Sequence, residues 1–312
     1  MPSRRCLLAA LALAPLAPGR PALAQAAPER LPVVATFSIL ADLVRQVGGE
    51  RVAVDALVGP DGDAHVYAPT PADGRRLAAA RLVVANGLGF EGWIDRLIKA
   101  SGTKAAVVQA SRDVKPLRPR GAHGHPHGHG HAHGRGHAAD PHAWQDVANA
   151  KLYAVAIRDA LIQADPAGRE AYQANADAYA ARLDALDAEV RATVARIPED
   201  RRRIVTSHDA FPYFEAAYGL AFFAPQGVST EAEASAADVA RLIRQIRRER
   251  ITAVFVESVT DPRLIERIAK ETGARVGERV YSDALSPPGG PAGTYIDMVR
   301  HNIRAFGAAL GA

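Results

Sequence analysis

Three histidines and one aspartate follow apolar, β-branched segments of the sequence, His142 only after a long loop. They are His65 in VGPDGDAHVY, His142 in ADPHAW, His208 in IVTSHDAF and Asp283 in RVYSDAL. Ligands of parallel α/β sheets bind beyond the carboxyl ends of the strands, so these side chains are expected to meet. Imidazole and carboxylate form the preferred tetrahedral shell of Zn²⁺ where no thiolate is available. One histidine in such a place is most often an ordinary loop residue, but four residues at equivalent places indicate a metal centre.

Three further carboxylates lie in these segments or at the end of another predicted strand. Glu257 ends another apolar segment and is the substitute if Asp283 is not the fourth ligand. Asp63 and Asp209 lie beside histidines, and they are either acceptors that fix the imidazole tautomers or solvated turn residues. Because histidine must lose its proton to bind a metal, the affinity is expected to fall below about pH 6.5.

A histidine-rich tract separates the segments of His65 and His142. Residues 118–137 read RPRGAHGHPHGHGHAHGRGH and, proline aside, contain no apolar side chain larger than alanine. This composition cannot offset the entropy of ordering, so a disordered loop is predicted. We interpret it as a low-affinity zinc collector that feeds the main site, with a dispensable solvated loop as the alternative. Its histidines are His123, His125, His127, His129, His131, His133 and His137.

Residues 1–24 have the pattern of a cleaved secretory signal, with paired arginines, an apolar run and the small-residue sequence ALA at 22–24. The 312-residue chain has a formal charge of +4, and this segment removes Arg4, Arg5 and Arg20 without any acid, which leaves 4 − 3 = +1. That charge gives no support for a nucleic-acid partner. The one cysteine, Cys6, leaves with the segment, which excludes a disulfide, a thiolate metal site and a cysteine nucleophile. A periplasmic location is predicted, with the Sec and twin-arginine routes both open.

The elements that must position the four residues alternate between strands and helices. Strands are predicted over 31–37, 51–58, 82–85, 105–108, 203–206, 220–224, 252–257 and 275–281. Helices are predicted over 39–47, from Pro71, and over 91–100, 149–164, 212–218, 236–248, 262–272 and 295–310. Because each crossover contains a helix, the sheets are expected to be rich in parallel pairs.

This alternation predicts an α/β protein of two lobes, each with a roughly four-stranded, parallel-rich sheet flanked by helices. The amino-terminal lobe is expected over 25–148 and contains the tract, linking helices occupy 149–198, and the carboxyl-terminal lobe covers 199–312. A single long helix over about 167–196 would measure about 45 Å and join the lobes.

Two enzyme interpretations compete with a simple binding site. GLGFEG at 87–92 matches G-x-G-x-x-G and is followed by Asp113, but this unit is not the first βα unit of the chain, and export removes it from the main nicotinamide pool. A zinc hydrolase needs three ligands, an open position and a base such as Glu257, but no H-E-x-x-H motif occurs. His301, Trp93 and Trp144 are expected to be helix or packing residues without a chemical role.

Together these segments resemble the periplasmic zinc/manganese solute-binding proteins of ABC importers, the ZnuA/TroA-like class. The resemblance covers nearly the whole chain after the export signal. It rests on VVATFSILADLVRQVGG, VGPDGDAHVYAPTP, LVVANGLGFEGW, ADPHAWQDVANAK, TSHDAFPYFEAAYG, VFVESVTDPRLIERIAKETG and YSDALSPPGGPAGTYIDMVRHN.

The resemblance implies that His65, His142, His208 and Asp283 are the ligands of one ion, which the two lobes clamp while the long helix restricts hinge motion. In this class a carboxylate in place of the third histidine goes with manganese, so His208 implies Zn(II) as the cargo. It also implies a monomer that is not an enzyme and that delivers zinc to a membrane permease, with a periplasmic zinc chaperone as a further partner. A manganese-specific protein and a free zinc chaperone or buffer are the alternatives.

Overall fold

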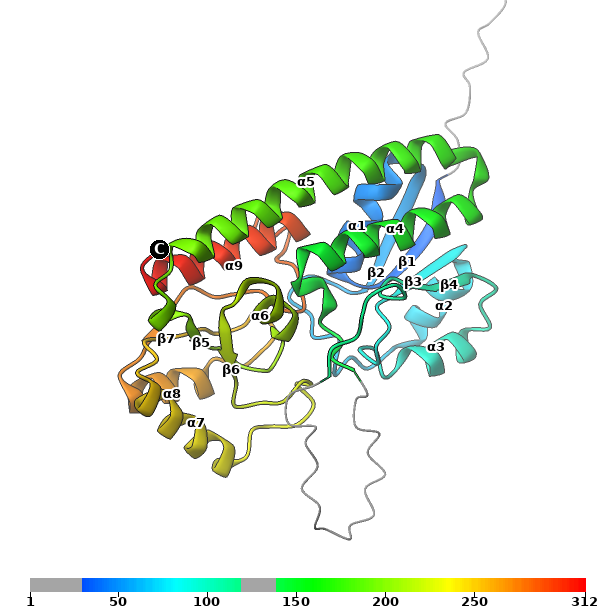
Figure 1. Ribbon diagram of the computed structural model, residues 1–312. Coiled ribbons are helices and arrows are strands. Elements are labelled where there is room, and N and C mark those ends of the chain that lie inside the picture. Colours follow the sequence, from blue (N-terminus) through cyan, green and yellow to red (C-terminus); the bar gives the residue numbers. More distant parts are fainter. Residues whose placement is uncertain (1–29, 119–138) are drawn as a thin grey trace, which may run out of the picture.

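Two parallel four-stranded sheets lie at opposite ends of the molecule and are bridged by a long helix (Figure 1). The computed structural model describes residues 30–118 and 139–312. The strand order is β2-β1-β3-β4 in the first sheet and β6-β5-β7-β8 in the second. The predicted fold class is confirmed, and the strand order, which the sequence left open, follows the same pattern in both lobes. None of the helices in these two ranges is long and apolar enough to cross a membrane.

The amino-terminal lobe follows the predicted elements closely. It consists of β1 (Leu31–Phe37), α1 (Ser38–Gly48), β2 (Val52–Val58), α2 (Pro71–Ala79), β3 (Leu82–Ala85), α3 (Ile94–Ser101) and β4 (Ala106–Gln109). β1 is apolar apart from the buried Thr36, as expected of a strand with both faces covered. α2 begins at Pro71, where Thr70 and Asp73 form a capping box. α3 begins later than predicted, because Glu91 turns into the interior instead of starting the helix.

Two linking helices connect the lobes, α4 (Val147–Ala164) and α5 (Arg169–Arg196). The 28 residues of α5 give it a length of about 42 Å. It packs against α1 at one end and against α9 of the other lobe at its far end (Figure 1). The predicted start at residue 167 is wrong by two residues, because Pro166–Gly168 form a separate 3₁₀ turn that fits between Arg51 and Tyr172.

The carboxyl-terminal lobe has shorter strands than predicted. Its elements are β5 (Arg203–Val205), α6 (Pro212–Tyr218), β6 (Ala221–Phe223), α7 (Ala236–Glu249), β7 (Ala253–Val254), α8 (Arg263–Thr272), β8 (Arg275–Val276) and α9 (Tyr295–Leu310). The predicted strands 252–257 and 275–281 are wrong in length, since only one further bridge, Glu257 to Val280, follows β7 and β8. Gly277 interrupts the second of them where the chain passes directly over the ring of Phe255.

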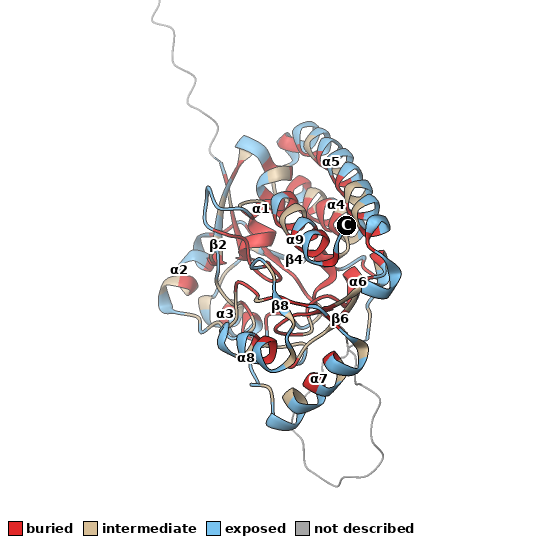
Figure 2. Ribbon diagram, turned by 90° about the vertical axis from the view of Figure 1, so that its left-hand side faces the viewer, coloured by how far each residue is buried: buried red, intermediate tan, exposed pale blue. Residues whose placement is uncertain are grey.

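Buried apolar side chains form two clusters. The larger one runs from the first sheet through α1, α4 and α5 into α6 and α9. The smaller one joins the second sheet to α7 and α8 and consists of Val205, Leu242, Ile243, Ile246, Ile251, Val254, Ile265, Ile268 and Ala269. Figure 2 shows the buried faces of α1 and α9 turned inward and the exposed outer faces of α7 and α8. The two lobes are therefore joined by one continuous core, and the outer layer of the second lobe has a core of its own.

Candidate metal centre

The structure brings the four sequence-predicted ligands together between the lobes. His65 Nε2 lies 3.2 Å from His142 Nε2 and 3.3 Å from Asp283 Oδ2. His208 Nε2 lies 3.1 Å from the same Asp283 oxygen, and His142 Nε2 lies 3.7 Å from Asp283 Oδ1. One ligand atom from each residue falls within a single group in which all atoms are within 4.8 Å of one another. Tetrahedral bonds of about 2.0–2.1 Å place ligand atoms about 3.3–3.4 Å apart, so the observed spacing suits an ion of this kind.

His65 and His142 are placed by the same local device, an aspartate two residues earlier in the chain. The backbone N–H of His65 donates to Asp63 Oδ1, and that of His142 donates to Asp140 Oδ1, both at 2.9 Å. Asp140 also reaches the ring, with Oδ1 at 3.1 Å from His142 Nδ1. That contact leaves Nε2 of His142 directed at the site.

Buried side chains from the amino-terminal lobe hold the loops that carry these two histidines. Asn86 donates to the carbonyl of Pro141, and Trp93 donates to the carbonyl of Ala64. The ring of His65 lies against Phe90 with 4.6 Å between ring centroids. Trp93, expected to be a packing residue, therefore also fixes the main chain beside a candidate ligand.

His208 follows β5 and is held by Glu257, which follows the neighbouring strand β7. Glu257 Oε1 accepts from the backbone N–H of His208 at 2.9 Å, and Oε2 lies 2.6 Å from its Nδ1. Both residues are fully buried. Glu257 is thus the partner of a candidate ligand, and its oxygens are not part of the converging group.

Asp283 lies in a segment whose main chain is bonded to the amino-terminal lobe. The carbonyl of Ser282 accepts from Trp144 Nε1 at 2.9 Å and from Gln145 Nε2 at 2.8 Å. Trp144, expected to be a packing residue, thus also makes a polar contact next to a candidate ligand. No pattern in the sequence predicts the hydrogen bond between the Trp144 indole and Ser282.

The polar atoms at the centre have few other partners. His208 Nε2 and both oxygens of Asp283 are buried and make no hydrogen bond to the described part of the chain. An unpaired buried polar atom costs about 1–3 kcal/mol, so this arrangement is suited to a ligand that these atoms share. The donor set, three imidazoles and one carboxylate, fits a divalent metal cation.

The pKa values of the candidate ligands are shifted in different directions. Burial lowers the pKa of His65 below its ordinary value. Burial also acts to lower the pKa of His208, but the carboxylates of Glu257 and Asp283 outweigh it and raise the pKa well above that value. Burial acts to raise the pKa of Asp283, but His208 and His142 outweigh it and hold the pKa well below the usual range. The metal-free site therefore keeps a negative charge on Asp283, which a cation would neutralise.

Asp63 and Asp209 were the residues expected either to fix imidazole tautomers or to lie in solvated turns. Asp63 Oδ1 accepts from the His65 main chain, and Oδ2 accepts from Thr230 Oγ1 at 2.6 Å, across the junction of the lobes. Asp209 lines a separate cavity of about 410 Å³, and both ring nitrogens of His208 face other carboxylates. Asp63 thus contacts the main chain of His65 and the hydroxyl of Thr230, and Asp140, which was not predicted, makes the ring contact to His142. The shared pattern D-x-H at 63–65 and 140–142 was the available signal.

The glycine-rich turn at 87–92 is filled by the protein itself. Gly87, Leu88 and Gly89 have positive φ. The buried carboxylate of Glu91 accepts from the N–H groups of Asn86 and Gly87 and from Thr36 Oγ1. Backbone N–H groups in such a turn bind phosphate when they are free. Here Glu91 occupies that position, so the motif builds a loop and not a nucleotide site.

The remaining predicted residues are a peripheral histidine and the tract. His301 Nε2 contacts the carbonyl of Arg279 at 2.7 Å, away from the converging group. The histidines of the tract, His123 to His137, and the export segment 1–24 lie outside the described residues.

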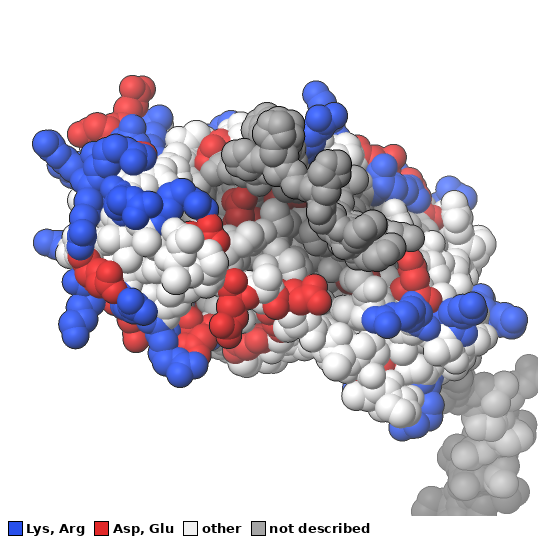
Figure 3. Space-filling view, turned by 90° about the horizontal axis from the view of Figure 1, so that it is seen from below, with Lys and Arg blue, Asp and Glu red and all other residues white. Residues whose placement is uncertain are grey.

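The face seen in Figure 3 has carboxylates near the junction of the lobes, while Lys and Arg lie mostly toward its outer edges. A cavity of about 440 Å³ at this junction is lined by Asp63, Glu233 and Asp261, by Arg263, which is paired with Asp261, and by Ser207, the neighbour of His208.

Comparison with known proteins identifies the family. Residues 33–309 match the model of the ZnuA family, described as the periplasmic component A of a zinc-uptake complex. The chain is 33% identical over 283 residues to the manganese-binding lipoprotein MntA of Halalkalibacterium halodurans, covering 90% of this chain and 89% of that one. It is 30% identical over 283 residues to the metal ABC transporter substrate-binding lipoprotein SloC of Streptococcus mutans, with 89% of each covered. Among solved structures, the periplasmic zinc-binding protein TroA of Treponema pallidum matches with a TM-score of 0.82 and 32% identity, over 91% of this chain and 100% of that one.

Proposed function

Since the chain belongs to the ZnuA family of metal-binding components of ABC importers, we propose that it captures one Zn(II) between its lobes and delivers it to a membrane permease. One observation carries the proposal: three imidazole nitrogens and a carboxylate oxygen converge with the spacing of a tetrahedral shell. In this proposal His65, His142, His208 and Asp283 bind the ion directly, and Asp140 and Glu257 orient two of the imidazoles. The ion is the cargo, and the lobes are its clamp.

Zinc is proposed over manganese because of the donor set. Three nitrogens and one carboxylate suit four-coordinate Zn²⁺, whereas Mn²⁺ prefers more oxygen ligands. The names of the relatives include both manganese and zinc, so the comparisons leave this choice open. His208 is the residue on which it depends.

The geometry argues against a zinc hydrolase. Asp283 takes the fourth position, where hydrolysis needs a bound water. Glu257, the base that such an enzyme would use, has both oxygens directed at His208. The family is one of solute-binding components and not of enzymes.

The segments outside the described residues complete the proposal. Residues 1–24 are proposed to direct export to the periplasm by the Sec or twin-arginine route, and the protein is proposed to act as a monomer. The tract at 118–137 is proposed to collect zinc at low affinity. A free zinc chaperone or buffer with the same site would differ in one respect, because no permease would take zinc from it.

Competitive loading tests the proposal. Metal-free protein that begins after residue 24 is dialysed against equal zinc and manganese at neutral pH, and the bound metals are measured for the wild type, His208→Ala and Asp283→Ala. One tightly held zinc, lost or weakened in both variants and retained in the control His301→Ala, is expected. Deleting residues 121–137 should lower total zinc but keep the tight equivalent. A preference of the wild type for manganese would overturn the zinc assignment.

A further inference from the structure

Asp283 belongs to the carboxyl-terminal lobe by sequence, but its main chain is bonded to the amino-terminal lobe. We infer that Trp144 and Gln145 are positioning residues that hold Asp283 in place beside His142, so that one loop of the amino-terminal lobe sets two ligands from opposite lobes. The inference rests on the proposed function, because it gives Asp283 the role of a metal ligand.

The contacts surround Asp283 on both sides. Before it, the carbonyl of Ser282 accepts from Trp144 Nε1 and Gln145 Nε2. After it, the N–H of Leu285 donates to Ser38 Oγ at 2.9 Å, and the carbonyl of Leu285 accepts from the N–H of Asp61 at 2.9 Å. The Asp283 carboxylate itself faces the imidazoles of His65, His142 and His208, so these main-chain bonds are what attaches its backbone to the amino-terminal lobe.

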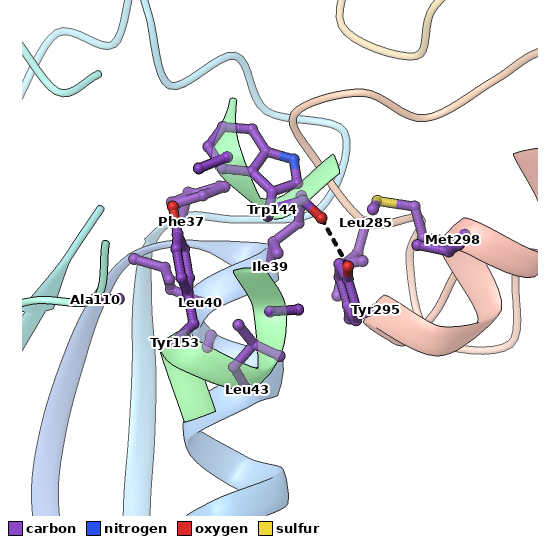
Figure 4. Close-up of a cluster of buried hydrophobic side chains, with 14 of the residues drawn as sticks. Phe37, Ile39, Leu40, Leu43, Ala110, Trp144, Tyr153, Leu285, Tyr295 and Met298 are labelled. Atoms are coloured by element: carbon purple, nitrogen blue, oxygen red, sulfur yellow. Dashed lines mark hydrogen bonds between the residues drawn. The ribbon is translucent and has the colours of Figure 1, made fainter. Parts of the chain in front are cut away.

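Trp144 is itself rigidly held. It is fully buried, and its ring packs on Phe37 and Phe90 with centroids 5.1 and 5.0 Å away. Its carbonyl accepts from Tyr295 Oη at 2.6 Å, and Figure 4 shows this bond together with Leu285 beside the indole. A donor fixed in this way defines the position of its acceptor within a narrow range.

Trp144 and Gln145 also belong to the short helix η2 (Ala143–Gln145) that directly follows His142. The ring of His142 lies against the indole with 5.4 Å between centroids. A displacement of this turn would therefore move His142 and Asp283 together. His208, in contrast, is held by Glu257 of its own lobe.

The attachment to the carboxyl-terminal lobe ends one residue earlier in the chain. Asn302 of α9 accepts from the N–H of Tyr281 and donates to its carbonyl. The change of attachment thus falls between Tyr281 and Ser282. Three ligands, His65, His142 and Asp283, are set by the amino-terminal lobe, and one, His208, by the other.

A double-mutant cycle tests the inference. Trp144→Phe combined with Gln145→Met removes both donors to Ser282 while keeping most of their volume. Zinc affinity is measured by chelator competition, and Co(II) absorption reports the ligand geometry. The combined change is expected to weaken zinc by about 10- to 100-fold, the usual effect of losing the partner of a metal ligand. It should add little to the loss caused by Asp283→Ala but its full loss to that caused by Glu257→Gln, because both hydrogen bonds that are removed end on Ser282, the neighbour of Asp283.

The matched control is Asn175→Leu, which removes another amide donor to a backbone carbonyl, that of Val47, far from the site. It should leave zinc affinity and the Co(II) spectrum unchanged. A merely structural role for Trp144 and Gln145 would give losses that add to every ligand variant alike, and that result would overturn the inference.

Amide hydrogen exchange of the metal-free protein separates this inference from the proposed function. The combined substitution should speed exchange over residues 282–286 and leave residues 203–208 unchanged. Unchanged exchange over 282–286 would overturn the inference even if zinc binds tightly. Faster exchange there in a protein that binds no zinc would overturn the proposed function instead.

Discussion

β1 and β2 of the amino-terminal lobe are seven residues each, whereas β7 and β8 of the carboxyl-terminal lobe are two residues each. In the amino-terminal lobe, the long paired strands β1 and β2 support the loops that carry the ligands. The second sheet ends early, and buried carboxylates and loops continue the structure to the site. Both lobes place ligands at the metal centre. The carboxyl-terminal lobe depends more on contacts between residues far apart in the sequence.

The partners of His142 and His208 make the difference concrete. Asp140 lies two residues before His142, so its contacts form as soon as the local turn forms. Glu257 is separated from His208 by 49 residues and meets it only when β5 and β7 are paired. The carboxyl-terminal lobe also supports the partner of His142, since Tyr213 of α6 donates to the carbonyl of Asp140. The imidazole of His142 is thus oriented by a residue close to it in sequence, and that of His208 by a residue that only the folded sheet brings to it.

The largest expected effect is loss of a ligand from either lobe. His142→Ala and His208→Ala should each weaken zinc binding by more than the roughly 10- to 100-fold caused by loss of a ligand's partner. Calorimetric titration of protein lacking residues 121–137 measures both. A tight site that survives in either variant would show that the lobes do not both bind the ion.

The next effect concerns the two hydrophobic clusters. Ile268→Ala in the smaller cluster and Ile39→Ala in the larger one each remove a fully buried side chain, at a cost of about 2–5 kcal/mol in free energy of unfolding. Hydrogen exchange should show Ile268→Ala opening α7 and α8 with the first sheet still protected. Ile39→Ala should reduce protection throughout. Equal loss of protection in both lobes of the Ile268→Ala protein would contradict separate cores.

The carboxylate partners give a smaller effect. Asp140→Asn and Glu257→Gln should each lower zinc affinity by about 10- to 100-fold. Glu257→Ala should exceed Glu257→Gln, because it also removes the acceptor for the His208 main chain. Chelator competition provides the measurement, and the order of these variants tests the long-range support of His208. Equal zinc affinities for the two Glu257 variants would show that Glu257 acts through the imidazole of His208 alone and not through its main chain.

The pH dependence distinguishes the histidines of the two lobes. Because the pKa of His208 is raised well above its ordinary value, zinc must displace a proton from it at neutral pH. Burial lowers the pKa of His65, so that residue competes with zinc only at lower pH. Zinc affinity should therefore fall as pH falls, by about tenfold per unit where one proton is displaced. Calorimetry in buffers of different ionisation enthalpy should detect the released proton, and a pH-independent affinity would contradict the histidine shell.

The smallest expected effect comes from the hydrogen bond between Thr230 and Asp63. Thr230→Val removes the hydrogen bond from Thr230 to Asp63 that joins the lobes. A single hydrogen bond contributes about 0.5–1.5 kcal/mol, so zinc should dissociate roughly 2- to 10-fold faster. Ser229→Ala, in the same loop, is the control, since its hydroxyl accepts only from Glu231 of that loop. Equal rates for the two variants would remove this bond from the clamp.

Most of the fold could be predicted because local signals coincide with its elements. β1, α6 and α9 match their predicted bounds, and Gly219 and Gly311 end the two helices with positive φ. The lengths of β7 and β8 could not be predicted, because an apolar extended segment reads the same whether or not a neighbour pairs with it. Which loop carries a ligand follows from strand ends, and this placed all four converging residues.

The partners of the ligands were predicted less well. The sequence placed Asp63 and Asp209 beside histidines, but adjacency does not determine which oxygen faces a ring. Asp140 and Asp63 share the spacing D-x-H, and only Asp140 reaches the imidazole. The contacts of Trp144 and Gln145 join segments 137 or more residues apart, which no local pattern encodes.

X-ray absorption at the zinc edge tests the central claim most directly, because it reads the ligand shell itself. The sample is zinc-loaded protein without residues 121–137, so that only the site between the lobes contributes. The account predicts four nitrogen and oxygen neighbours at about 2.0–2.1 Å, with the outer-shell signals of three imidazoles. A shell of six oxygen-rich neighbours, or one with fewer imidazoles, would contradict it.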